Sequence, residues 1–272
     1  MSAMASSALE LRHAIRRGEH TGLTTGRAPG HVQANLVVLH ETHARDFLAF
    51  CGLNAFACPV LGVSKTGSPL IPVLGADLDV RTDLPGYHIH RPNSAPEKVT
   101  DISSFWRDDL VAVTIGCWFS MEDALHQAGV RLRHVELGIQ GPLFMTNLKT
   151  RGEGIFGGPL VVSMRPFAKE SVATVREVTG RFSRVHGGPI HVGDPAAFGI
   201  ADIGRPDFGE VLTPLPDEVP MYWGCGLTAT VALQKSGIGF FITHAPGKML
   251  VTDCLNVSLS ASLETHPEST FA

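Results

Sequence analysis

Six segments of β-forming residues each end in a turn that carries Arg, Asp, Cys, Thr or His beside Gly or Pro. In an open α/β sheet, ligands bind in the crevice outside the carboxyl ends of the strands. Reactive side chains placed repeatedly at such positions indicate an enzyme, because a structural module has little use for them in tight turns. The segments begin at Leu78, Val111, Val161, Pro189, Val219 and Phe240.

Two candidate catalytic side chains follow the second of these segments. Cys117 lies between a predicted buried strand and the start of a predicted helix, where backbone N–H groups and the helix dipole lower the pKa of a thiol. Cysteine also packs as a small apolar residue, so both interpretations stay open. Glu122, one turn further on, is either an acid/base group or a carboxylate that complements the helix dipole.

Groups that could bind an anion occur at three other strand ends. Arg81 and Asp83 could grip a substrate carboxylate and move a proton, or they could form an ordinary turn. Arg165 ends another strand and could hold a carboxylate or pair with a neighbouring Glu. The turn 224–226, with Cys225 at its centre, resembles an anion-binding turn that leads into a helix.

Histidines complete the set of candidates. His191 and Asp194 lie three residues apart across a turn, and a carboxylate often orients a catalytic His. His244 lies at the end of another strand. His88 and His90 are two residues apart, so they share one face of a predicted strand. We expect both side chains to be exposed. We predict no metal site, because the sequence contains neither an HxxxH nor a CxxC spacing.

The composition narrows the class of protein. Of the 272 residues, 44% are hydrophobic and 18% are charged, which favours a folded chain with a large core. The net charge of −4 and the lack of a basic block argue against a nucleic-acid partner. The apolar stretches are too short to cross a membrane, and the N-terminus lacks the apolar region of a signal peptide. We therefore expect a cytoplasmic protein whose five cysteines are free thiols.

The order of predicted elements indicates an α/β fold in two parts. Helices are expected over 8–17 and 43–51 and after Ser120, and a buried strand over 110–115. Three strands (133–139, 142–148 and 158–166) and an amphipathic helix (168–182) then suggest a smaller two-layer α+β domain over 132–185. This domain would be inserted in a larger mixed-sheet α/β domain, 1–131 plus 186–272, whose first sheet the chain would rejoin after residue 186.

An ordered set of motifs resembles the D-glutamate cyclase family, many of whose bacterial members are named hydro-lyases. The resemblance runs from about Arg17 to Asp253. Three positions depart from the family pattern: Trp118, Met145 and Lys248. The motifs are QANL at Gln33, DFLAFC at Asp46, RTDLP at Arg81, DDLV at Asp108, IGC at Ile115, TN at Thr146, VVSMRP at Val161, HVGDP at His191, VPMYWGCG at Val219, THAPG at Thr243 and MLVTD at Met249.

The resemblance implies a two-domain α/β fold and elimination of water without a cofactor, most specifically the closure of D-glutamate to 5-oxo-D-proline. For that reaction we expect carboxylates to bind Arg81 and Arg165. Asp83, Asp194 and His191 would move protons. N–H groups at Gly116–Cys117 and in the 224–226 turn, including Gly226, would face the oxyanion.

Two other classes of function stay open. One is an amino-acid racemase or epimerase that uses Cys117 and Cys225 on opposite faces of a substrate carbon. The other is a non-catalytic binder of small carboxylates. In each case the partner is a small carboxylic acid, and the protein could be a homo-oligomer.

Overall fold

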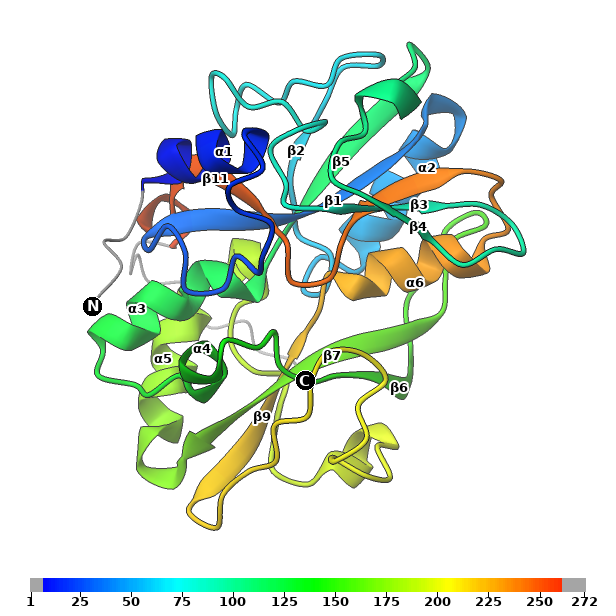
Figure 1. Cartoon of the computed structure of the whole chain (residues 1–272). Helices are drawn as coiled ribbons and strands as arrows, with labels where there is room; N and C mark the ends of the chain where they lie inside the picture. The colour runs from blue at the N-terminus through cyan, green and yellow to red at the C-terminus, as the bar shows by residue number, and fades with distance from the viewer. Residues whose placement is uncertain (1–6, 261–272) are drawn as a thin grey trace, which may run out of the picture.

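Two antiparallel sheets form the framework of the computed structural model, which describes residues 7–260 (Figure 1). The larger sheet has the order β2-β5-β1-β10-β3-β4, and β11 also pairs with β1. The smaller sheet has the order β6-β7-β9-β8. The strands are β1 (His31–His40), β2 (Val60–Val63), β3 (Tyr87–His90), β4 (Glu97–Val99), β5 (Leu110–Gly116), β6 (Leu143–Lys149), β7 (Pro159–Ala168), β8 (His191–Val192), β9 (Glu218–Gly224), β10 (Phe241–His244) and β11 (Leu250–Leu255).

Strand β1 is central to the larger sheet because apolar side chains point from both of its faces. Leu36 and Val38 pack into one hydrophobic cluster, and Val37 and Leu39 pack into another. Side chains alternate between the faces of a strand, so the apolar run 36–39 must be covered on both sides. Along β1, Ala34 pairs with Gly116 of β5, which brings the end of β5 beside the polar residue Asn35.

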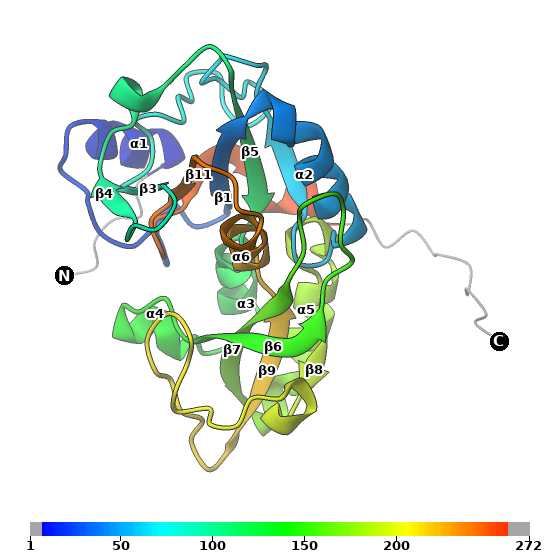
Figure 2. The same cartoon turned by 90° about the vertical axis from the view of Figure 1, so that its right-hand side faces the viewer.

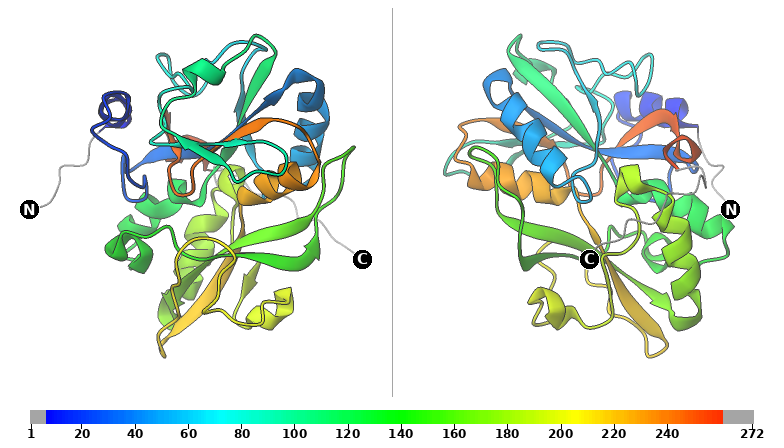
Figure 3. Two further views of the ribbon diagram at one scale, coloured as in Figure 1. Left: turned by 45° about the vertical axis from the view of Figure 1, so that its right-hand side comes forward. Right: turned by 180° about the vertical axis from the view of Figure 1, so that it is seen from behind.

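Helices cover these sheets and join them. Helix α2 lies across the back of the larger sheet, and α6 lies between the two sheets (Figures 2 and 3). Side chains of α6 share one hydrophobic cluster with strands of both sheets. None of the described helices is long and apolar enough to span a membrane. The α-helices are α1 (Ala8–Arg16), α2 (Glu41–Leu53), α3 (Glu122–Gln127), α4 (Arg133–Leu137), α5 (Val172–Gly180) and α6 (Leu227–Lys235).

The α/β class is confirmed, with two corrections to the predicted elements. The expected strand at 133–139 is the short helix α4, which ends at Gly138 in the left-handed region. The segments β8 and β9 do not rejoin the larger sheet: β9 pairs with β7 from Val162↔Gly224 to Ala168↔Glu218. Only β10 and β11 return to β1. The division into domains at 132 and 186 remains a prediction, and the smaller sheet extends beyond its predicted end.

The antiparallel pairing changes where reactive turns can meet. Every strand ladder in residues 7–260 is antiparallel, so the carboxyl ends of neighbouring strands point to opposite edges of their sheet. The expected sharing of one crevice by all six turns therefore fails. Only the turns that the two sheets bring face to face can form a common site.

Candidate active site

Arg165 is a buried charged residue without an ion-pair partner among residues 7–260. Its side chain on β7 is buried, with 2% of the residue exposed. The two terminal nitrogens donate to the carbonyls of Met164 (2.8 Å) and Gln140 (2.7 Å), whereas Nε has no partner. No carboxylate in the described residues lies within ion-pair distance, and burial lowers the pKa of this guanidinium. A buried cation without a counter-charge is costly, so it favours an anionic ligand.

Arg165 faces a small space between the sheets, which we call the inner cavity. Its volume is about 30 Å³, which suits water and is too small for an amino acid. Two further buried donors in its wall, Ser163 Oγ and Trp118 Nε1, also lack partners. Three unpaired donors around one space are suited to a carboxylate. The lining residues are Asn35, Cys117, Trp118, Phe119, Gln140, Leu143, Ser163, Arg165, His186, Cys225, Gly226 and Met249.

Both sheets supply this lining, from the ends of β5 and β9 and from the middle of β7. The expectation that Arg165 ends its strand is therefore wrong. Ser163 and Arg165 are two residues apart on β7 and therefore share one of its faces. Cys117 follows β5 of the larger sheet, and Cys225 follows β9 of the smaller one. Asn35 Nδ2 donates to the carbonyls of Ile115 and Gly116, and no described residue donates to its Oδ1. Its amide oxygen is thus an acceptor at the inner cavity.

Two glycines make room for these groups. A Cβ on Gly226 would lie 2.4 Å from Nδ2 of Asn35, and a Cβ on Gly141 would lie 2.8 Å from Nη1 of Arg165. Gly141 also has φ +85°, a conformation that L side chains rarely adopt. The shape of the inner cavity and the positions of its polar groups therefore require glycine at 141 and 226.

The thiols differ from their predicted chemistry. Burial raises the pKa of both Cys117 and Cys225, the opposite of the expected effect of the helix start. The N–H groups expected to face an oxyanion are also occupied. Gly116 donates to Pro59, Cys117 to Gln33 and Cys225 to Val161. Gly226 N–H has no backbone acceptor in the described chain, but three of the other predicted donors are occupied, so the oxyanion hole expected from these turns is largely wrong.

His186 is a lining residue that sequence reasoning missed. It has φ +96° and is buried, and its Nδ1 lies 3.1 Å from the carbonyl oxygen of Phe56. Burial lowers its pKa to about 4, which makes the ring neutral near pH 7. Asn35 was missed as well, although a polar residue inside the apolar strand β1 is a usable signal. His186 offered no comparable signal.

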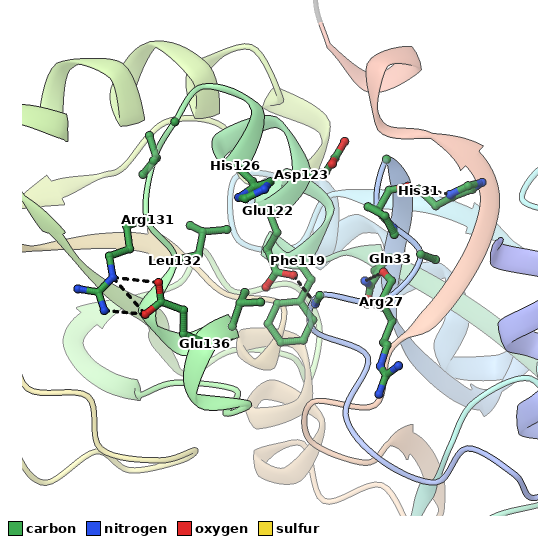
Figure 4. Close-up of a pocket in the computed structure, with 17 residues that line it drawn as sticks. Arg27, His31, Gln33, Phe119, Glu122, Asp123, His126, Arg131, Leu132 and Glu136 are labelled. Atoms are coloured by element: carbon green, nitrogen blue, oxygen red, sulfur yellow. Dashed lines mark hydrogen bonds and ion pairs between the residues drawn. The ribbon is translucent and has the colours of Figure 1, made fainter. Parts of the chain in front are cut away.

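A second and larger space lies on the other side of Phe119, which lines both. This outer pocket has a volume of about 510 Å³ (Figure 4). The predicted acid/base residue Glu122 lies at its wall and accepts hydrogen bonds from Thr25 Oγ1 (2.7 Å), Gly26 N (2.8 Å) and His134 Nε2 (2.9 Å). The lining residues are Gly26, Arg27, Ala28, Pro29, Gly30, His31, Gln33, Phe119, Glu122, Asp123, His126, Gly129, Val130, Arg131, Leu132, Val135 and Glu136.

Arg81 and Asp83 lie elsewhere, in separate ion pairs. Asp83 is fully buried and accepts from Arg16 Nη2 at 2.8 Å, which fixes α1 to the loop before β3. Arg81 Nη2 binds Asp79 Oδ2 at 2.6 Å. Neither residue lines the inner cavity, and the expected joint grip on a substrate is absent from this arrangement.

The predicted histidine sites are also outside the inner cavity. His191 Nε2 lies 2.9 Å from the backbone oxygen of Asp194, whose carboxylate instead caps a short 3-10 helix through Ala196 N. His244 is buried beside the backbone of Leu36, and burial lowers its pKa to about 4. His90 is buried too, so the expected exposure of that side chain is wrong. The described residues contain no cluster of three or more His, Cys, Asp or Glu suited to a metal.

Fold and site together define an α/β protein with a closed, cation-lined cavity between two antiparallel sheets. The model of the D-glutamate cyclase family matches residues 111–253, which include every lining residue of the inner cavity except Asn35. The chain belongs to this family.

Relatives support the assignment over nearly the whole chain. A protein of Burkholderia multivorans is 47% identical, covering 92% of this chain and 96% of its own length. One from Pseudomonas aeruginosa is 49% identical, covering 90% and 92%. A third, from a Methylobacterium species, is 49% identical, covering 91% and 92%. All three carry the name "putative hydro-lyase".

Proposed function

We propose that this protein is a hydro-lyase that acts on a small amino or carboxylic acid, most specifically on D-glutamate to form 5-oxo-D-proline and water. The observation that carries the proposal is the buried, unpaired guanidinium of Arg165 facing the inner cavity. Family membership and the names of the relatives support the hydro-lyase class.

The reaction balances without a cofactor. The substrate nitrogen forms a bond to the side-chain carboxyl carbon, and one oxygen of that carboxyl departs. The two protons that the ammonium group loses leave with this oxygen as water. The protein therefore has to position the two ends of the substrate and pass protons between them, and positioning alone can lower a barrier by about 7–11 kcal/mol.

We assign the roles from the inner cavity. Arg165 and Ser163 donate to a substrate carboxylate, and Asn35 Oδ1 accepts from the substrate nitrogen. Neutral His186 and the protonated thiol of Cys117 or Cys225 are the groups able to relay a proton. Because the cavity is smaller than glutamate, side chains of its wall must move when the substrate enters.

A two-thiol racemase is the second candidate, because Cys117 and Cys225 line the same inner cavity. Such an enzyme needs one thiolate to remove the α-proton. The raised pKa of both thiols works against this step. The non-catalytic binder of carboxylates would use Arg165 in the same way and differs only in lacking turnover.

Proton NMR in deuterated buffer separates these three functions. The protein is incubated with D-glutamate, and with L-glutamate in a parallel tube. We expect 5-oxoproline from the D-isomer alone with its α-proton retained. Exchange of the α-proton without ring closure would favour the racemase. Binding of D-glutamate without any chemical change would favour the carboxylate binder.

A further inference from the structure

The outer pocket has the size and the walls of a ligand site. Its volume of about 510 Å³ lies within the range of small-molecule pockets. Phe119, Val130, Leu132 and Val135 provide apolar surface. Figure 4 shows the polar ends of Glu122 and Gln33 both above the Phe119 ring in this view. The pocket is therefore an apolar space with polar groups concentrated on one wall.

Gln33 has a hydrogen-bond acceptor without a donor at the wall of the outer pocket. Its Nε2 donates to the carbonyls of Thr24 (3.0 Å) and Arg27 (3.2 Å), which fixes the orientation of the amide. The opposite atom, Oε1, is buried and has no hydrogen-bond partner, and only 1% of the residue is exposed. A buried acceptor without a donor is costly, so it favours a ligand that carries an N–H or O–H group.

Glu122 adds negative charge to the same wall. Its three donors are a hydroxyl, a backbone N–H and the ring of His134. Burial lowers the pKa of His134, so this ring is neutral near pH 7 and supplies no counter-charge. No Lys or Arg of residues 7–260 forms an ion pair with Glu122.

The other charges of the pocket do not pair with Glu122. Arg27 lines the pocket with an exposed side chain that forms no ion pair in residues 7–260, and Figure 4 shows its guanidinium directed away from the Glu122 carboxylate. Arg131 and Glu136 at the rim pair with each other at 2.7 Å and are largely exposed. Asp123 contributes a further carboxylate to the lining. The polar wall thus offers acceptors and negative charge, whereas the inner cavity offers unpaired donors and the positive charge of Arg165. The two spaces are suited to opposite ligand groups.

We propose that the outer pocket is a separate binding site for a small amine with an apolar body. The ammonium group binds Gln33 Oε1 and the Glu122 carboxylate, and the apolar body packs against Phe119, Val130 and Val135. This site is independent of the reaction proposed for the inner cavity. It requires no turnover and no particular substrate there.

Isothermal titration with 2-phenylethylamine tests the proposal, with 2-phenylethanol and phenylacetate as probes of equal shape and different charge. We expect the amine to bind at least about tenfold more tightly than either probe. Val135→Trp fills the pocket and should weaken amine binding at least about tenfold. The matched control is Leu137→Trp on the same helix, where the side chain is 59% exposed and outside the lining, and binding should not change.

Two further variants test whether the amine binds at the outer pocket and not at the inner cavity, and whether weaker binding could come from misfolding. Glu122→Gln, checked for an unchanged melting temperature, should bind the amine more weakly. Arg165→Gln should bind it at least as tightly as the unmodified protein does, because the substitution removes a positive charge near Glu122. The proposal is overturned if the alcohol binds as tightly as the amine, if Val135→Trp leaves the affinity unchanged, or if no amine binding is detected.

Discussion

The guanidinium of Arg165 lies over the ring of Trp118, with Cζ 5.1 Å from the ring centroid. The same ring meets His134 edge to face at 5.4 Å, and His134 in turn hydrogen-bonds Glu122. This row of side chains runs from the inner cavity to the outer pocket. Trp118 therefore bears on both sites: its ring shields the buried cation and holds the neutral histidine in place.

The cysteines distinguish the two catalytic candidates. Cys117→Ser and Cys225→Ser should each retain turnover of D-glutamate within about tenfold, because neither thiol needs to form a thiolate for cyclisation. Both thiols should also react slowly with iodoacetamide at neutral pH, since burial raises their pKa. The NMR assay described above measures turnover. If the unmodified protein instead exchanges the α-proton, complete loss of this exchange in both variants, with folding intact, would favour the racemase.

Gly141 should be required for the position of Arg165. Gly141→Ala adds the cost of φ +85° for an L residue, about 1–2 kcal/mol, and a contact 2.8 Å from the guanidinium. Gly138→Ala is the matched control, with φ +64° and no atom within 4 Å of the added Cβ. Urea unfolding should show a loss of stability in both variants, and only Gly141→Ala should lose activity. Equal activities of the two variants would show that the site does not require Gly141.

Asp83 should matter for stability and not for chemistry. Asp83→Asn removes one of the two carboxylates that Arg16 and the fully buried Arg12 share, and leaves Asp77 as the other. Breaking a buried ion pair costs about 3–5 kcal/mol. Urea unfolding measures this loss. The folded variant should keep the kcat of the unmodified enzyme, and a folded but inactive variant would restore the catalytic role that the sequence suggested.

Three buried histidines should make the protein sensitive to acid. Burial lowers the pKa of His90, His186 and His244 from 6.5 to about 4. The unfolded chain therefore binds more protons between these values, so the free energy of unfolding falls as the pH drops from 6.5 to 4. The loss is up to about 3 kcal/mol for each of His186 and His244, and smaller for His90, which solvent screens more. Urea titrations across this range measure the slope. His244→Gln should reduce it, and an unchanged slope would contradict this origin.

Local patterns in the sequence predicted much of the fold. The helices near residues 8–17 and 43–51 and the buried strand before Cys117 follow from apolar spacing, and each is present. Strand partners depend on contacts between distant segments. Nothing in the pattern of 189–195 or 219–224 tells whether those strands join β1 or β7, and the prediction for them was wrong.

The candidate site was predicted only in part, because it too depends on contacts between distant segments. Arg165, Cys117, Cys225 and Gly226 meet at the inner cavity because β5 and β9 end there and the middle of β7 passes beside it. Asp83, Asp194 and His191 have suitable chemistry, yet their partners are local turns or helix α1. A residue type and a turn do not specify which neighbour a side chain will bind. His186 depends on a backbone conformation that its sequence context does not reveal.

The most direct test of the account is the effect of Arg165 on turnover and on binding of 5-oxo-D-proline. The comparison uses Arg165→Gln, with Arg165→Lys as a conservative variant and Arg81→Gln as the control at a paired arginine outside the site. We predict that Arg165→Gln lowers kcat/KM for D-glutamate at least about 100-fold, close to 2.7 kcal/mol, and abolishes measurable product binding. Arg165→Lys should recover a small part of the lost kcat/KM. Arg81→Gln should have the kcat/KM and the product affinity of the unmodified enzyme. A folded Arg165→Gln that retains turnover and product affinity would contradict the assignment of the substrate carboxylate to the inner cavity.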